Sequence, residues 1–471
     1  MKKIIAKKEF ISLWRDRRFG IVGGIIVLLL LTATIVGYLN YQKIQTERAS
    51  AAKSADELWL NQGNKNPHSA AHYGSFAYRP KSPLSFLDFG TDSFTGMSVK
   101  LEAHKQNDAV FSAAQDASSL IRFGELTVAF VLQILMPLLI IFLCFNAFTQ
   151  EKEEKTLQIL LSQGVSMQDL AWGKILGFFG IIACLVMPIL LIISVLIGTQ
   201  SDMAFDGSWL LRTGFLSLGY LAYLFVFVMI SVWVSARVAS SRNALLTLLA
   251  VWIFACIIIP KATVNVASNI YPIPSNYAFN KKIGEDVDKG INGHDPEDAR
   301  AKVLEKEILK KYKVDSVSQL PVNFDGIQMQ EGEKYTSMVY NKHFQALQDT
   351  YKAQNRVSEI LGFLNPFLAI RQFSMAMAGS DYVTHAAFQQ QAEAHRFMLV
   401  EQQNNYMRDH SKTGDWEFTV NKEVWSKLPA FQYKEPNFSS VIANNLLAIL
   451  ALVVWVLVGI WSISKIKFSI N

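Results

Sequence analysis

The residue pattern that points most clearly to a mechanism lies between Gln150 and Lys174, directly after a long apolar run. Acidic residues open this segment, where negative charge suits the positive N-terminal end of a helix. Leucines along one side follow, and Gly164 permits a turn. Ser166 and Asp169 then have the S-x-x-D spacing that caps the start of a second helix. The pattern predicts a helical hairpin over residues 149–174.

A phosphate-binding loop is the second chemistry to test, because a nucleotide-driven pump needs one. Such a loop is written G-x-x-x-x-G-K-[ST], and its backbone N–H groups and lysine hold phosphates. Here Gly173-Lys174 is followed by Ile175, position 168 is Gln, and no other Gly-Lys-Ser/Thr occurs. The sequence also contains no G-x-S-x-G and no H-E-x-x-H motif. We therefore expect no catalytic residue, no cofactor-binding residue and no enzymatic activity in this chain.

Metal binding is the third chemistry, since His68 and His72 have the i,i+4 spacing that places two ligands on one helical face. Pro67 and the surrounding aromatic residues indicate a loop rather than a helix, and two ligands do not complete a site. Solvated loop histidines are the preferred interpretation, and it extends to His385 and His395. No metal site is predicted.

Six long apolar runs indicate that the chain crosses a membrane and that the hairpin and the polar segments connect its spans. The chain is 51% hydrophobic, and an α-helix of nearly twenty apolar residues crosses roughly 30 Å of hydrocarbon. The fifth run is the shortest. The predicted fold is therefore a membrane all-α protein with six spans. The spans are Gly20–Leu39, Leu126–Phe148, Ile175–Ile197, Thr213–Val234, Ala244–Pro260 and Val441–Ile463.

Lysine and arginine near the spans predict which connections face the cytoplasm, because cationic segments resist translocation. Residues 1–19 are rich in both and are expected to form an interfacial helix on anionic lipid, the alternative being a topology signal alone. The hairpin at 149–174 and the tail at 464–471 also carry lysines. Both termini are therefore expected in the cytoplasm, with the spans in a bacterial inner membrane.

Two large polar segments, residues 40–120 and 261–440, are then exported to the periplasm. Proline, glycine and aromatic residues recur in the first, which predicts mixed strands and helices, whereas the second is rich in helix-forming residues. All three cysteines lie in apolar runs, so no disulfide is expected in either segment. The net charge of +6 is small for 471 residues and no nucleic-acid module is evident, so nucleic acid is not an expected partner.

One apolar stretch inside the second polar segment tests the six-span topology. Val357–Met377 has the composition of a seventh span, which would move the C-terminus outside. Pro366 and Arg371 interrupt it, so we expect an amphipathic helix that lies on the outer membrane surface or packs in the exported domain.

The hairpin resembles a motif of the type-2 ABC exporter permeases. That motif has an E-x-E-x-G-T-L-like run after the second span, then Leu-Leu-Ser, then Val-Ser before a Gly-Lys that enters the third span. Lys155 stands here at the usual glycine, and Gln163-Gly164 stands where a small residue and proline are common. The matching residues are Glu151, Glu153, Thr156, Leu157, Leu160, Leu161, Ser162, Val165, Ser166, Gly173 and Lys174.

In that family this segment is the coupling helix that docks on the ATPase subunit, and the resemblance implies the same role for residues 151–170. An ordinary surface loop is the alternative. The large exported segments are similar to those of the bacterial branch whose permeases carry two periplasmic insertions. The implied coupling residues are Glu151, Glu153, Glu154, Thr156, Leu157, Leu160, Leu161, Ser166 and Asp169.

The resemblance implies a permease subunit that moves a lipid-, peptide- or natural-product-like cargo outward. Its implied partners are a dimer of ATPase chains that bind ATP and magnesium, a second permease copy or paralogue, membrane lipid, and periplasmic or outer-membrane components. A membrane scaffold or sensor with a ligand-binding periplasmic domain is the alternative function. Polar residues within the spans either pack helices or contact cargo, namely Gln133, Asn146, Ser231 and Ser235.

Overall fold

The computed structural model describes residues 1–112, 126–199, 207–295 and 297–466. Six helices within these ranges are long and apolar enough to cross a membrane, which confirms the predicted number. The last residues of the first polar segment and of the tail, including Lys467, lie outside the described ranges. The six helical runs are Phe19–Leu60, Val128–Glu153, Met167–Gly198, Ser208–Arg237, Ser241–Ile270 and Leu446–Ser464.

The elements follow one another as helices with a single small sheet. From the N-terminus to the first long connection they are α1 (Lys2–Trp14), α2 (Arg17–Leu60), α3 (Pro67–Tyr73), β1 (Ser75–Tyr78), β2 (Ser98–Glu102) and β3 (Lys105–Gln106). The central spans and hairpin are α5 (Val128–Phe130), η2 (Val131–Leu135), α6 (Met136–Cys144), α7 (Thr149–Glu153), α8 (Thr156–Ser162), α9 (Met167–Gly198), α10 (Ser208–Arg237), α11 (Ser241–Ile253), η3 (Phe254–Ile258) and α12 (Ile259–Ile270). The remainder is α13 (Asn276–Val287), α14 (Ala299–Tyr312), η4 (Val317–Gln319), α15 (Phe324–Leu361), α16 (Pro366–Ala378), α17 (Tyr382–His410), α18 (Lys422–Trp425), α19 (Phe438–Asn444) and α20 (Leu446–Ser464).

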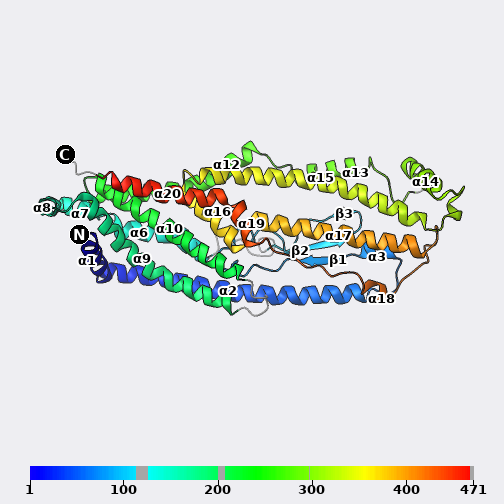
Figure 1. Cartoon of the computed structure of the whole chain (residues 1–471), viewed down its shortest axis with the longest axis horizontal. Coiled ribbons are helices and arrows are strands. Elements are labelled where there is room, and N and C mark those ends of the chain that lie inside the picture. The colour runs from blue at the N-terminus through cyan, green and yellow to red at the C-terminus, as the bar shows by residue number, and fades with distance from the viewer. Residues whose placement is uncertain (113–125, 200–206, 296, 467–471) are drawn as a thin grey trace.

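The molecule is a long rod with the apolar helices at one end and the polar segments at the other (Figure 1). The N-terminus, the C-terminal end of the description and the α7–α8 hairpin all lie at the apolar end. Helix α2 continues to Leu60, well past the predicted end at Leu39, and so joins the bundle to the polar end. It continues because no helix-breaking residue follows the apolar run.

The fifth span is longer than the sequence predicted. Its helix runs from Ser241 to Ile270 instead of ending at Pro260, because the proline falls in the first turn of α12, directly after the π-helical turn η3. Proline lacks the N–H that continues the helical ladder, and the preceding π-helical turn accommodates this interruption without ending the helix.

A second π-helical turn, η2, lies in the second span, and side chains of other elements bond to the backbone in both turns. The indole of Trp252 donates to the carbonyl of Ile134 at 3.0 Å, and the amide of Asn365 donates to that of Ala255 at 2.8 Å. A wider turn weakens the local helical ladder, and π-turns are often found at functional sites.

The apolar stretch around Pro366 is a short helix buried in the bundle. Asn365 caps α16, whose 13 residues extend only about 20 Å, too short to cross a membrane. Nearly all of α16 is buried, and it packs against α10 and α20. The expected position on the outer membrane surface is therefore wrong, and the helix instead joins the main core. The ring of Phe373 lies so close to Gly219 on α10 that a Cβ there would be 2.3 Å from it.

The two polar segments fold together. The antiparallel sheet β1-β2-β3 belongs to the first segment, and its buried side chains Ala77, Val99 and Leu101 pack against Phe388 and Ala392 of α17. An isolated β-bridge joins Lys65 to Val420. The first segment therefore has the mixed structure and the second the helical structure that their compositions predicted.

Candidate functional site

The first helix packs closely along the start of α9 because α9 presents glycines to it. A Cβ at Gly173 would lie 2.5 Å from the Cβ of Ile5, and one at Gly177 would lie 2.7 Å from the Cβ of Glu9. Glycines four residues apart share one helical face and allow two backbones to approach. Helix α1 is therefore held against the third span and the hairpin.

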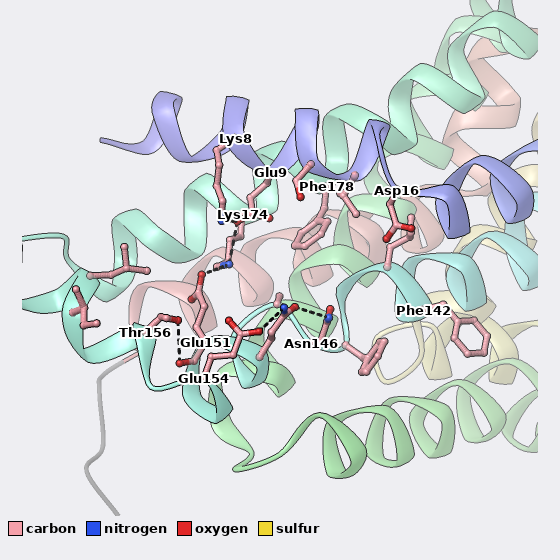
Figure 2. Close-up of a pocket in the computed structure, with 18 of the residues that line it drawn as sticks. Lys8, Glu9, Asp16, Phe142, Asn146, Glu151, Glu154, Thr156, Lys174 and Phe178 are labelled. Carbon is pink, nitrogen blue, oxygen red and sulfur yellow. Dashed lines mark hydrogen bonds and ion pairs between the residues drawn. The ribbon is translucent and has the colours of Figure 1, made fainter.

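Lys174 connects three elements through buried charge. Its ammonium lies 3.2 Å from a carboxylate oxygen of Glu9 on α1 and 2.8 Å from one of Glu151 on α7, and the lysine is only 3% exposed. Figure 2 shows the three side chains pointing toward one another. Because a buried charge is costly without a partner, the three groups depend on one another.

Two neighbouring residues of α7 attach the hairpin to the turn between α10 and α11. The ammonium of Lys152 donates to the carbonyls of Ala236 at 2.7 Å and Val238 at 2.8 Å, at the C-terminal end of α10. The carboxylate of Glu153 accepts from the backbone N–H of Ser241 at 2.7 Å and from its hydroxyl at 2.9 Å. Each charge lies at the helix end whose dipole favours it.

The turn between α7 and α8 has the backbone conformation that glycine adopts most easily. Lys155 has φ 58°, in the left-handed region, and it stands where the exporter motif usually has glycine. Thr156 donates from its hydroxyl to the carbonyl of Glu151 at 3.4 Å. Gly164, with φ +83°, makes the turn after α8, and Ser166 then caps α9 by accepting from the N–H of Asp169 at 3.0 Å.

Helix α8 has one face toward the bundle and one face free. Leu157 is buried, and Leu160 and Leu161 are partly buried against the main core. Gln158, Ile159 and the following Ser162–Gly164 are exposed, with Ile159 at 57%. Helix α8 lies at the extreme end of the rod (Figure 1).

A pocket of ≈ 570 Å³ opens between α1, α7, α8 and the second and third spans (Figure 2). Glu9, Glu151, Glu154 and Lys174 line it together with Asn146, whose amide donates to Gln150 at 3.0 Å. Gln150 in turn donates to Glu154 at 2.9 Å. Asn146 thus belongs to the polar surface of the hairpin.

The other three polar residues that were singled out in the spans, Gln133, Ser231 and Ser235, lie between helices. Ser235 accepts from the backbone N–H groups of Phe148 at 2.9 Å and Thr149 at 3.3 Å, which joins α10 to the hairpin. Ser231 is fully buried, and its hydroxyl has no hydrogen-bond partner among the described residues.

Gln133 lies in the π-turn η2 and belongs to a buried network at the other end of the bundle. Its amide donates to the hydroxyl of Tyr220 at 3.0 Å, and that hydroxyl lies 2.6 Å from the hydroxyl of Ser374 on α16. Ser374 donates to the carboxylate of Asp88 at 2.6 Å. Burial raises the pKa of Asp88, although Ser374 and Arg371 act in the opposite direction. These contacts favour helix packing over cargo contact for Gln133.

Three residues of these buried ion-pair and hydrogen-bond networks were not predicted from the sequence to be part of them. Glu9 was not singled out, although it is one of only two acidic residues among the many cationic residues of the N-terminal segment. Lys174 was assigned only to the motif, and Asp88 had no sequence signal because its partners are distant in the chain. Lys2 also pairs with Asp169 at 3.5 Å, in a largely exposed position.

The histidines that were predicted to lie in solvated loops lie on helices instead. His68 and His72 lie on helix α3, because Asn66 caps it and Pro67 occupies its first turn, where proline is well tolerated. His68 is buried rather than solvated, and so is His385 on α17. His395, also on α17, is partly buried and lies against Phe431.

Comparison with known proteins gives one finding. Residues 277–434 match the family described as "Domain of unknown function (DUF3526)". The matched residues cover α13 to α18, which is most of the second polar segment and none of the hairpin. A comparison with curated proteins gives no match.

Proposed function

We propose that this chain is the permease subunit of an ATP-binding-cassette exporter, and that the α7–α8 hairpin receives the movement of a separate ATPase. The observation that carries the proposal is the asymmetry of the hairpin. Its first helix is bonded directly to α9, α10 and the start of α11, and through Lys174 to Glu9 of α1, whereas part of α8 is exposed. A displacement of α8 would therefore reach several spans at once.

Two further features support this role. The backbone at Lys155 is left-handed, a conformation that glycine adopts easily, and this supports the comparison with the glycine position of the exporter motif. Helix α1 and the hairpin, which carry lysines, lie at the same end of the rod as the end of α20, and this end is expected in the cytoplasm.

The proposed assembly contains two permease chains, identical or paralogous, and two ATPase chains in a bacterial inner membrane. ATP and magnesium bind the ATPase chains. The cargo is lipid-, peptide- or natural-product-like, and the polar segments extend into the periplasm. A membrane scaffold or sensor remains the alternative, and it requires no ATPase at the hairpin.

Purification of this chain from the cells that produce it, with any ATP-binding-cassette ATPase that accompanies it, tests the proposal. We expect the complex to form in lipid nanodiscs, and Ile159→Glu, at an exposed residue of α8 that also lines the pocket, to weaken it at least tenfold, as for a central apolar contact of an interface. Val303→Glu on α14 is the matched control, because Val303 is equally exposed at 57% but lies at the opposite end of the rod.

Equal retention of the ATPase by both variants would place its docking site elsewhere. A wild-type chain that binds no ATPase under these conditions would overturn the exporter proposal.

A further inference from the structure

Four histidines from the two polar segments converge on one point. His68 and His72 come from α3, His104 from the turn between β2 and β3, and His294 from the loop after α13. One ring nitrogen of each lies within 4.8 Å of the others. The Nε2 atoms of His68 and His72 are 3.1 Å apart, and those of His104 and His294 are 3.0 Å apart.

These separations are close to those around a tetrahedral metal ion. A zinc–nitrogen distance of about 2.0–2.1 Å implies ligand nitrogens about 3.3 Å apart at the corners of a tetrahedron. A chance group of imidazoles would turn some ring nitrogens toward other partners. Here both close pairs are made by Nε2 atoms that face one another.

Two of the rings are oriented by partners at their other nitrogen. Nδ1 of His68 lies 2.9 Å from the amide oxygen of Asn404, which accepts its proton. Nδ1 of His104 lies 3.1 Å from a carboxylate oxygen of Glu333. Protonation at Nδ1 leaves the Nε2 lone pair free to bind a metal, and carboxylate or carbonyl partners of this kind are typical of histidine ligands.

Glu333 is itself held in place by buried charge. Its second oxygen lies 2.5 Å from a guanidinium nitrogen of Arg396, which also pairs with Glu393 at 2.8 Å. Glu333 further accepts from the backbone N–H of His104 at 2.8 Å, which fixes the turn that carries this histidine. The orientation of His104 therefore depends on the packing of α15 and α17.

Burial disfavours the charged form of three of the four rings. Burial lowers the pKa of His68 to about 3 and also lowers the pKa values of His72 and His294. His72 and His294 are exposed while His68 is buried, so the cluster opens to solvent on one side. An ion would therefore have a path of entry.

We propose that His68, His72, His104 and His294 bind one divalent transition-metal ion, of which Zn²⁺ best fits four imidazole ligands in a tetrahedral arrangement. Imidazole nitrogen also suits copper and nickel, but neither polar segment supplies a cysteine that would select a softer ion. The ion joins the first polar segment to the loop before α14 in the second. It thus acts as a clip between two parts of the chain.

Zinc binding by the full-length chain, purified in detergent without a polyhistidine tag, tests this site. After EDTA treatment and dialysis against Zn²⁺, elemental analysis is expected to find one zinc ion per chain. The double variant His72→Gln/His294→Gln should bind zinc at least tenfold more weakly. Both substituted side chains are exposed, so the core is left in place.

The control is His410→Gln, an exposed histidine outside the cluster that should bind zinc like the wild type. Zinc should raise the thermal midpoint of the wild type and the control but not of the double variant, and all three should melt alike without metal. Co²⁺ should give the intense visible absorption of a tetrahedral site only in the wild type and the control.

Failure of the wild type to retain zinc would overturn the proposal, as would equal zinc binding by the double variant. If the double variant melts earlier than the wild type without metal, zinc binding is measured for the single variant His294→Gln instead, because His294 lies in a loop. Unchanged zinc binding by that single variant would also count against the site.

Discussion

At the scale of single residues, one buried histidine, His385, makes the stability of the polar segments sensitive to acid. His385 on α17 is 6% exposed, and burial lowers its pKa to about 4, with Arg79 and Lys81 acting in the same direction and Asp92 opposing them. In the unfolded chain an ordinary histidine has a pKa of about 6.5. The unfolded state therefore binds more protons between these values, and stability is lost as the pH falls through that window.

His385→Leu should reduce this pH dependence. Between pH 7 and pH 5 the wild type should lose about 2 kcal/mol of stability through His385 that the variant does not lose. Thermal midpoints in nanodiscs at both pH values measure the effect, and the wild type should show the larger drop. His410→Leu, at an exposed histidine, is the matched control. An identical drop for His385→Leu and the wild type would contradict the assignment.

At the scale of helices, the packing of α1 on α9 beside the hairpin depends on two glycines of α9. Helix α1 lies on α9 only because Gly173 and Gly177 have no side chains, and the Lys174 charge cluster then forms beneath it. A side chain at either glycine would collide with backbone or Cβ atoms of α1, which cannot move aside as a flexible side-chain end can.

Gly177→Leu should displace α1 from α9. Overpacking of a tight contact typically destabilises a protein by about 1–3 kcal/mol. A Cβ at position 177 would lie 2.7 Å from the Cβ of Glu9, so we expect a destabilisation in the upper part of that range. Crosslinking by a bifunctional thiol reagent between cysteines placed at Lys2 and Asp169, which are paired in the native protein, reports whether α1 stays in place once the three native cysteines are replaced.

Gly214→Leu on α10 is the control, because a Cβ at Gly214 has nothing within 4 Å. Crosslinking should be strongly reduced in Gly177→Leu and retained in the control. Full crosslinking in both would show that α1 accommodates the added side chain.

At the scale of the whole molecule, the two polar segments lie at one end and the hairpin, the N-terminus and the end of α20 at the other (Figure 1). Insertion of the six apolar helices into a membrane would place the polar segments on one side and the hairpin on the other. The cationic N-terminal residues predict that the hairpin side is the cytoplasm.

Labelling with a membrane-impermeant maleimide tests that orientation. Single cysteines at Lys310 on α14 and at Gln163 beside α8, both exposed, are introduced after the three native cysteines are replaced. Cells with a permeabilised outer membrane should label the Lys310→Cys variant before lysis and the Gln163→Cys variant only after it. The reverse order would place the hairpin outside.

Local patterns in the sequence were sufficient for the spans and for the hairpin. A run of about twenty apolar residues commits a segment to the membrane whatever its neighbours are. Likewise the cap at Ser166 and the turn at Gly164 act within a few residues and were predictable from the sequence. The break at Lys155, which divides the predicted first helix into α7 and α8, was not predicted. The helical composition of the second polar segment was equally local.

Contacts between distant parts of the chain were decided only by the tertiary structure. The four-histidine cluster needs α3, a β-turn and a loop of the other polar segment, so His68 and His72 looked like an incomplete pair in the sequence. Pro366 likewise marked a break, but only the space between α10 and α20 explains why α16 is buried. Apolar length and helix caps are properties of neighbouring residues, whereas ligand sets and buried charge depend on which elements pack together.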